Sequence, residues 1–244
     1  MNFTDFIKLK PDNLNKFDKF EVIGSGSKDF INEEPNIAQI FTNTSFSRIK
    51  KKDIKFLVLS SGWIMDLDII LSGPQFKNIS SNELKKVRIH KSKLINDLNV
   101  DYLFIKSNSS ENKIRNLLKK KRIKFNNLII ITDRDIFKML LREVGIINLI
   151  KIANQIPCSK LKLFLWIFSL GKIKNSKSMR PSIGLIAVLI FKGVTSILNI
   201  QPLELNGITG KSNEFGFYGN SSKTLLNHRS HLIDLYILEI FFGN

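Results

Sequence analysis

One stretch decides the fold: Arg180-Pro-Ser-Ile-Gly-Leu-Ile-Ala-Val-Leu-Ile-Phe-Lys-Gly193, followed by Val194-Thr-Ser-Ile-Leu-Asn-Ile200. A charged residue and a small-residue turn lead into an apolar run, which predicts a buried helix that ends at Gly193. The last five residues of the second run predict a strand. Gly184 and Ala187 are small enough to let the helix lie close on a sheet, so the pattern indicates an α/β fold.

The start of this helix is a candidate anion site. The first backbone N–H groups of a helix have no partner within the helix, and the helix dipole favours negative charge there. Arg180 and Ser182 stand at that position, and a loop-to-helix junction of this kind is a usual place to hold a phosphate. An ordinary buried helix with a capped start is the alternative, and the stretch itself leaves both interpretations open.

Length and composition narrow the class of protein. The 244 residues fit one large domain or two small ones, and a hydrophobic content of 43% is enough for a real core. The net charge of +17 suits polyanionic partners, namely nucleic acid, an acidic membrane surface or phosphate-bearing substrates. Because Lys, Ile and Asn are frequent throughout the chain, this charge favours none of these partners over the others.

Cys158 is the only cysteine, which excludes an intrachain disulfide framework and a cysteine-based zinc site. The first ten residues carry no long apolar segment, so we expect no secretory signal. The longest apolar run, Ile183–Phe191, is about half of a bilayer span. These features predict a cytoplasmic protein that does not cross a membrane.

Three short strands are expected early in the chain, each followed by small polar residues. Phe20–Ile23 leads to Gly24-Ser-Gly26, Ile37–Phe41 leads to Asn43, and Lys55–Ser60 leads to Ser61. A strand followed by Gly-x-Gly opens a nucleotide-binding βα unit, although the third glycine of the dinucleotide fingerprint is missing here. Ligands collect outside the carboxyl ends of parallel strands, so the series favours a nucleotide site over plain turns.

The middle of the chain predicts further helices and strands. Surface helices are expected at Leu84–Val87 and Ile114–Leu117, strands at Tyr102–Ile105 and Asn127–Thr132, one or two helices at Ile136–Ile152, and an apolar helix at Leu161–Phe168. We expect the last of these helices to pack in the core, with pairing to another subunit or contact with a membrane as the alternatives. The basic run Lys119–Arg122 is interpreted as a solvated helix end, with a polyanion contact as the less favoured interpretation.

Asp133-Arg-Asp135 directly follows a predicted strand and raises a metal hypothesis. Many nucleotide-sugar transferases place Asp-x-Asp there to hold a divalent cation on the diphosphate. Asp66 and Asp68 repeat the pattern, which shows how readily it arises by chance. Arg134 and the apolar residues downstream are typical of a helix start, so we favour Asp133 as a helix N-cap.

Residues 204–226 predict a long polar loop, of a length that is usually functional or mobile. The run Asn227-His-Arg-Ser-His231 follows, and Leu232–Phe242 predicts a final helix. His228 and His231 are therefore candidate general bases beside a glycine-rich loop, with surface capping as the alternative for each. His90 lies in a lysine-rich stretch and is interpreted as a surface residue.

The order of these motifs resembles the bacterial CMP-sialic acid-dependent sialyltransferases, over roughly residues 20–70 and 178–242. In that family a Gly-Asn-Gly-Pro-Ser turn binds CMP, where this chain has Gly24-Ser25-Gly26-Ser27-Lys28. The strand-end asparagine of the family corresponds to Asn43, and its Arg-x-Thr-Ser-Gly to Arg180-Pro-Ser-Ile-Gly184. The family's closing histidine, with an acid five positions later, corresponds to His228 with Asp234 six positions later, and His231 is the rival.

The resemblance implies a Rossmann-like, doubly wound domain of the GT-A-variant type over residues 20–244, with a mostly parallel sheet and an arm at 1–19. It implies that sialic acid, or a related acid sugar such as Kdo, moves from a CMP-activated donor to a glycan acceptor without a metal or cofactor. A histidine would accept the acceptor proton, and Arg180 and Ser182 would stabilise the leaving phosphate. The remaining implied nucleotide contacts are Gly24, Ser25, Gly26, Asn43, Ser61 and Gly184.

The net positive charge also suggests binding partners, and two alternative functions remain. The basic surface suits peripheral contact with the inner face of an anionic membrane that carries a glycolipid or polysaccharide acceptor, and a homo-oligomer stays open. One rival is another nucleotide-dependent enzyme, either NAD-using or a metal-dependent sugar transferase. The other is a nucleic-acid-binding protein, but the chain has no helix-turn-helix, zinc or aromatic-sheet signature, so we expect no nucleic-acid partner.

Overall fold

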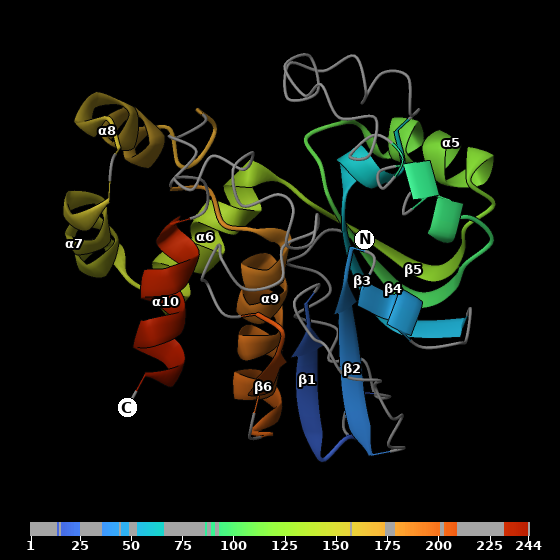
Figure 1. Cartoon of the computed structure of the whole chain (residues 1–244). Helices are drawn as coiled ribbons and strands as arrows, with labels where there is room; N and C mark the ends of the chain where they lie inside the picture. Colours follow the sequence, from blue (N-terminus) through green and yellow to red (C-terminus); the bar gives the residue numbers. More distant parts are fainter. Residues whose placement is uncertain are drawn as a thin grey trace.

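The computed structural model describes residues 14, 16–24, 36–43, 45–48, 53–65, 86, 89–90, 93–156, 158–173, 179–200, 203–208 and 232–243. In this part of the chain, six parallel strands form one sheet with α-helices on both faces (Figure 1). The strands are β1 (Lys19–Ile23), β2 (Ile37–Thr42), β3 (Asp53–Ser60), β4 (Asn99–Lys106), β5 (Lys124–Ile131) and β6 (Leu203–Asn206). The α-helices are α5 (Glu111–Lys120), α6 (Asp133–Glu143), α7 (Ile146–Gln155), α8 (Lys160–Phe168), α9 (Ile183–Leu198) and α10 (Leu232–Phe242).

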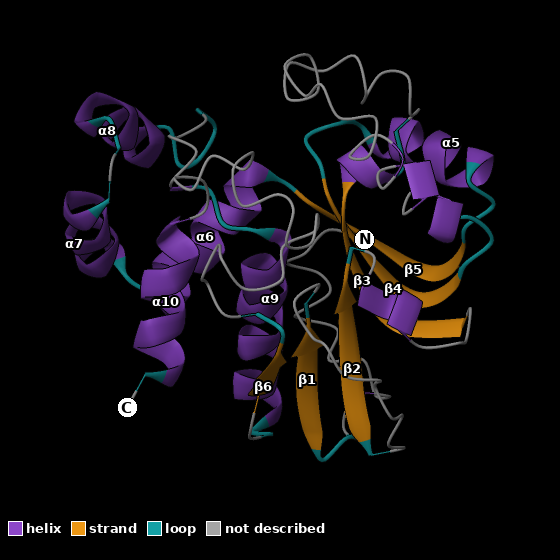
Figure 2. Ribbon diagram, in the orientation of Figure 1, coloured by secondary structure: helices purple, strands orange, loops and turns teal. Residues whose placement is uncertain are grey.

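The strand order is β5-β4-β3-β2-β1-β6 (Figure 2). The chain builds outward from β1 to β5 and then returns to add β6 on the other side of β1. In register, Glu21 of β1 lies between Gln39 of β2 and Glu204 of β6. The order therefore reverses beside β1, which is the position where open parallel sheets bind their ligands.

Both faces of the sheet are buried, because successive side chains of each strand point to opposite sides. Phe56 and Val58 of β3 belong to the core shared with α6 through α10, whereas Leu57 and Leu59 belong to the core shared with α5. This two-sided burial confirms the predicted doubly wound α/β fold. Leu14 and Phe17, which precede β1, are buried in the first of these cores.

Helix α9 contributes ten buried residues, from Leu185 to Thr195, and packs on the sheet. The ring of Phe191 lies 5.8 Å from Phe20, 5.4 Å from Phe56 and 5.7 Å from Phe104, measured between centroids. One side chain therefore joins β1, β3 and β4. The deciding stretch of the sequence does form the predicted buried helix on the sheet.

The predicted end of this helix is wrong. α9 continues through Gly193 to Leu198, and Asn199 ends it with a left-handed backbone (φ 54°). A Cβ added at Gly193 would overlap the guanidinium of Arg142 on α6, so this glycine leaves room for the end of that side chain. The strand predicted at 196–200 is also wrong, because Ser196 to Leu198 form the last turn of α9, whose packing on the sheet outweighs the weak strand preference of the β-branched residues there.

The sixth strand lies at Leu203–Asn206 instead, so the loop predicted to begin at 204 starts later. Most other predicted elements are confirmed, and the helical run at 136–152 divides into α6 and α7 at Gly145 (φ 80°). His90, Lys119 and Lys120 are exposed, as expected. Of the helix predicted at 84–87, only Lys86 is described, and it is helical and exposed. Residues 209–226 of the predicted loop lie outside the described residues. Among the described helices, none combines the length and apolarity needed to span a bilayer.

Candidate functional site

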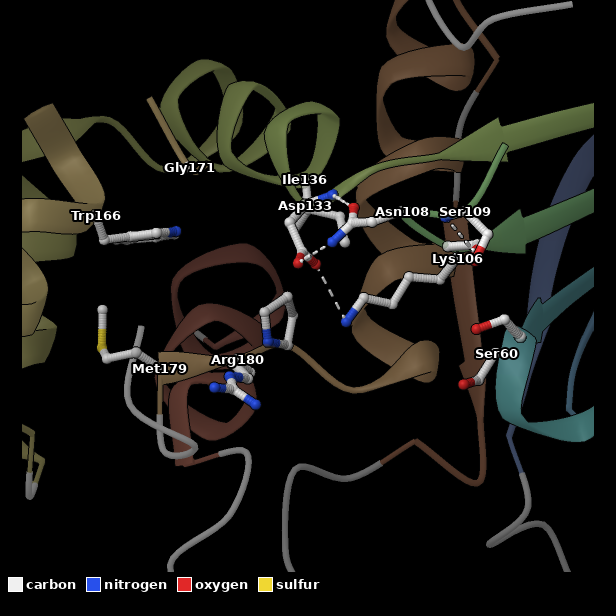
Figure 3. Close-up of a pocket in the computed structure, with 13 residues that line it drawn as sticks. Ser60, Lys106, Asn108, Ser109, Asp133, Ile136, Trp166, Gly171, Met179 and Arg180 are labelled. Carbon is white, nitrogen blue, oxygen red and sulfur yellow. Dashed lines mark hydrogen bonds and ion pairs between the residues drawn. The ribbon is translucent and has the colours of Figure 1, made fainter. Parts of the chain in front are cut away.

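A pocket of about 360 Å³ opens at the carboxyl end of the sheet (Figure 3). Its walls come from the segments after three neighbouring strands and from the segments around α8 and before α9. Ser60 ends β3 and Ser61 follows it, Lys106 ends β4 and Ser107, Asn108 and Ser109 follow it, and Asp133 and Ile136 follow β5. The other side is closed by Trp166, Gly171, Met179, Arg180 and Pro181. The pocket thus lies at the edge that the sequence predicted for ligand binding.

The lining is polar and carries more positive than negative charge. Hydroxyl and amide groups line the wall formed by β3 and β4, the ammonium of Lys106 and the guanidinium of Arg180 both border the pocket, and Asp133 supplies the carboxylate. Such a set of donors can bind an anionic ligand that also carries hydroxyl groups.

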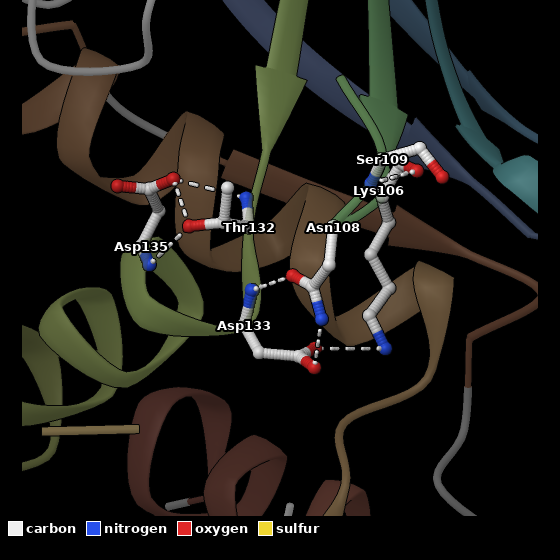
Figure 4. A network of polar contacts seen from close by, with 7 residues as sticks. Lys106, Asn108, Ser109, Thr132, Asp133 and Asp135 are labelled. Atoms are coloured by element: carbon white, nitrogen blue, oxygen red, sulfur yellow. Dashed lines mark hydrogen bonds and ion pairs between the residues drawn. The ribbon is translucent and has the colours of Figure 1, made fainter. Parts of the chain in front are cut away.

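Asp133 fixes the geometry of the wall (Figure 4). Its Oδ2 accepts a hydrogen bond from Asn108 Nδ2 at 2.7 Å, and its Oδ1 pairs with Lys106 Nζ at 3.4 Å. The backbone N–H of Asp133 donates to Asn108 Oδ1 at 3.0 Å. The loop after β4 is therefore tied to the start of α6, and Lys106 is held at the pocket by its ion pair.

The second carboxylate of the Asp-x-Asp motif has a structural role. Asp135 Oδ2 accepts from the backbone N–H of Thr132 at 2.9 Å and from Thr132 Oγ1 at 2.6 Å, while Thr132 Oγ1 accepts from Asp135 N at 3.2 Å. This capping box makes Thr132 the N-cap of α6, so the prediction of Asp133 as N-cap is wrong by one residue. Within the described residues, no three His, Cys, Asp or Glu side chains gather as metal ligands would. Asp66 and Asp68 lie outside those residues.

Two of the predicted site residues, Ser61 and Arg180, line the pocket. Asn43 lies directly behind the wall, because its Oδ1 accepts from the backbone N–H of Ser60 at 3.2 Å. Its left-handed backbone (φ 52°) is a conformation that asparagine tolerates better than most residues. Asn43 thus connects the end of β2 to the pocket through a hydrogen bond.

Gly24 and Gly184 meet at a common neighbour beside the pocket, Ile208, which follows β6. A Cβ added at Gly24 would lie 2.5 Å from Gly207 O and 2.6 Å from Ile208 Cγ1, and one added at Gly184 would lie 3.4 Å from Ile208 Cδ1. The backbone N–H of Gly24 also donates to Asn206 O at 2.8 Å. The two glycines therefore lie at the switch point between β1 and β6, outside the lining of the pocket.

Ser182 acts as the N-cap of α9. Its Oγ accepts from the backbone N–H of Leu185 at 3.2 Å, and its own backbone N–H donates to the buried carboxylate of Asp234 on α10. For the Ser182 side chain, the structure supports the capped-start alternative. The predicted residues Ser25, Gly26, His228 and His231 lie outside the described residues.

Sequence reasoning missed Lys106, Asn108, Ser109 and Trp166. The signal for Asn108 and Ser109 was available, because Ser107-Asn108-Ser109-Ser110 follows a strand just as small polar residues follow β1 to β3, and Lys106 is the last residue of that strand. Trp166 had no comparable signal. In the sequence it is one aromatic residue in an apolar run, which is typical of a core position. In the structure its ring also packs edge-on against Phe137, at 4.7 Å between centroids.

Cys158 does not qualify as a nucleophile in this site. It does not line the pocket, its Sγ donates to Ala153 O at 3.1 Å, and burial raises the pKa of the thiol. A raised pKa leaves less of the reactive thiolate near neutral pH. The chemistry of the site must therefore come from the polar lining of the pocket and from the residues that border it.

Comparison with known proteins adds no assignment to this site. No protein-family model, no curated protein and no solved structure matches this chain.

Proposed function

We propose that this chain is a glycosyltransferase that binds a CMP-activated acid sugar, sialic acid or a relative such as Kdo, and transfers the sugar to a glycan acceptor without a metal. The observation that carries the proposal is the convergence of separate motifs on one edge of the sheet. Gly24, Asn43 and Ser61 follow β1, β2 and β3, and Arg180 and Ser182 come from the start of α9. These motifs lie at opposite ends of the sequence, and their order first suggested a CMP-sugar.

The charges of the pocket suit such a donor. A CMP-activated acid sugar carries a phosphate and a carboxylate, and Lys106 and Arg180 border one pocket (Figure 3). In the reaction, the acceptor oxygen forms a bond to the anomeric carbon while the bond from that carbon to the phosphate oxygen breaks. CMP leaves with the electron pair, and a nearby cation stabilises its developing charge.

The acceptor proton requires a base, which we assign to His228 or His231. Support comes from the neighbouring described residues. Leu232 begins α10, and Asp234 in its first turn accepts a hydrogen bond from the backbone of Ser182 at the start of α9. The first turn of the helix that follows the two histidines is thus in contact with the edge of the candidate site.

Calorimetric titration with CMP tests the binding step. Arg180→Ala should weaken CMP binding by about tenfold or more, because a charge-assisted hydrogen bond is lost. The matched control is Arg115→Ala on α5, where the arginine is exposed and pairs with Glu111. Absence of CMP binding by the parent protein, or equal affinity in the parent and Arg180→Ala, contradicts the proposal.

Hydrolysis of the CMP-sugar donor tests the base. His228→Ala or His231→Ala should abolish turnover while CMP still binds, and His90→Ala, which changes an exposed residue, should leave turnover unchanged. If neither His228→Ala nor His231→Ala slows turnover, the histidine mechanism is wrong, whether or not CMP still binds.

A further inference from the structure

Helix α8 exposes an apolar face to solvent. Leu161, Phe164, Leu165 and Phe168 are 68, 55, 39 and 71% exposed. Their spacing of i, i+3, i+4 and i+7 puts them on one side of the helix, and we call these four residues the α8 stripe. The rings of Phe164 and Phe168 lie 4.1 Å apart between centroids, so they form one continuous aromatic surface. Apolar patches of this kind usually mark an interaction surface.

The other side of α8 is anchored in the protein. Leu163 and Trp166 are buried, and the Trp166 ring packs against Phe137 of α6. The helix begins with a cap, because Ser159 Oγ accepts from the backbone N–H of Lys162 at 3.3 Å. Figure 1 shows α8 at the margin of the molecule, away from the sheet. The α8 stripe is therefore a fixed, outward-facing feature.

Two exposed lysines flank the α8 stripe. At 3.6 residues per turn, Lys160 and Lys162 lie about 100° to either side of the middle of the stripe. Lysine side chains in this position lay their aliphatic stems along an apolar surface and extend their ammonium groups to its rim. This arrangement is typical of helices that lie in the interface of an anionic bilayer.

The surrounding sequence carries only positive charge. Residues 144–203, sixty in number, contain eight Lys or Arg and no Asp or Glu. The acids on either side of this stretch form ion pairs, Glu143 with Arg142 and Glu204 with Lys19. Apolar exposure also continues beyond α8, since Ile147 of α7 and Leu170 are 68 and 50% exposed.

We propose that α8 docks on the surface of an anionic lipid bilayer, with the α8 stripe among the upper acyl chains and Lys160 and Lys162 at the headgroup phosphates. A second copy of the chain fits this face less well, because a two-fold contact would bring the same lysines together. A nucleic acid would use the lysines but leave the exposed phenylalanines without a partner. The proposal concerns a surface outside the pocket and does not depend on the sugar that the pocket takes.

Flotation of the full chain with vesicles tests this docking. The protein should bind vesicles that contain phosphatidylglycerol and bind vesicles of phosphatidylcholine alone at least about tenfold more weakly, with a loss of binding as salt is raised. Phe164→Ala/Phe168→Ala should weaken binding by about tenfold or more, because two aromatic side chains no longer enter the bilayer. Lys160→Gln/Lys162→Gln should weaken binding to the anionic vesicles by a similar factor.

The matched control is Lys119→Gln/Lys120→Gln on α5, which removes the same charge from two exposed lysines elsewhere on the molecule and should leave vesicle binding nearly unchanged. Urea unfolding of each variant reports on folding, and CMP titration reports separately on the proposed function. The docking proposal is overturned if the parent protein does not float with anionic vesicles, or if the α5 pair weakens binding as much as the α8 pair. It is also overturned if Phe164→Ala/Phe168→Ala dissociates a dimer and vesicle binding is absent, which would assign the α8 stripe to self-association.

Discussion

The backbone N–H of Ser182 lies 3.0 Å from Asp234 Oδ1 and 3.3 Å from Asp234 Oδ2, so the carboxylate at the start of α10 holds the start of α9. Asp234 is only 5% exposed, and its contact with Ser182 spans 52 positions of sequence. The start of α9 forms one side of the pocket through Arg180 and Pro181. A buried acid of α10 therefore helps to hold this wall in position.

We predict that Asp234→Ala lowers the free energy of unfolding by about 1–3 kcal/mol, because it leaves a polar group at the helix junction without its acceptor. Asp234→Asn keeps an oxygen acceptor and should cost less. Urea unfolding measures both variants, and Glu239→Ala, an exposed acid on the same helix, is the control. Equal stability of Asp234→Ala and Glu239→Ala would show that the contact contributes little.

Gly24→Ala and Gly184→Ala should have different effects on the free energy of unfolding, either opposite in sign or clearly different in size. The new Cβ at residue 24 would overlap the backbone of Gly207 and cost roughly 1–3 kcal/mol by overpacking. At residue 184 it would make ordinary contacts, and the better helix propensity of alanine should leave stability unchanged or raise it by up to about 1 kcal/mol. Thermal unfolding measures both, and a destabilised Gly184→Ala would contradict the described packing around Ile208.

Asp133→Asn and Lys106→Gln should change anion binding in opposite directions. Removing the carboxylate leaves the pocket more positive and should strengthen CMP binding severalfold, whereas removing the ammonium should weaken it. The ion pair is partly exposed, so each change should cost less than about 1 kcal/mol of stability. Titration with CMP in EDTA is the measurement. If the parent protein instead binds CMP only after a divalent cation is added, and Asp133→Asn does not bind CMP even then, the metal hypothesis is supported.

Cys158 should react slowly with thiol reagents. Burial raises the pKa of its thiol, so at any given pH below that value the thiolate fraction is smaller than in free cysteine. The rate of reaction with a disulfide reagent, followed from neutral to alkaline pH, should rise with a midpoint above that of a cysteine-containing peptide. A midpoint at or below that of the peptide would mean that the thiol is more exposed than described.

Much of the fold could be predicted because the local signals agreed with the tertiary structure. Each of the first five strands is a largely apolar run followed by small or polar turn residues, and α8 and α10 were predictable from their apolar runs. Gly193 and the residues after it were misread because local propensity conflicts with burial at that point. The sixth strand was missed because its alternation, Leu203 and Leu205, covers only four residues.

The candidate site was predictable where it follows strand ends and not where it depends on packing between helices. Ser61 and Arg180 line the pocket because they follow β3 and precede α9. Trp166 reaches the pocket only through the packing of α8 on α6, which no local pattern reveals. The capping box at Thr132 is visible in the sequence as Thr-x-x-Asp. The N-cap was instead predicted at Asp133, because that residue also begins the Asp-x-Asp pattern.

Trp166 gives α8 a double connection, since its ring lines the pocket while the opposite side of the same short helix carries the α8 stripe. The same helix therefore forms part of the pocket wall and of the proposed bilayer contact. By thermodynamic reciprocity, if ligand binding in the pocket changes the affinity of α8 for a bilayer, the bilayer changes the affinity of the pocket for that ligand by the same factor.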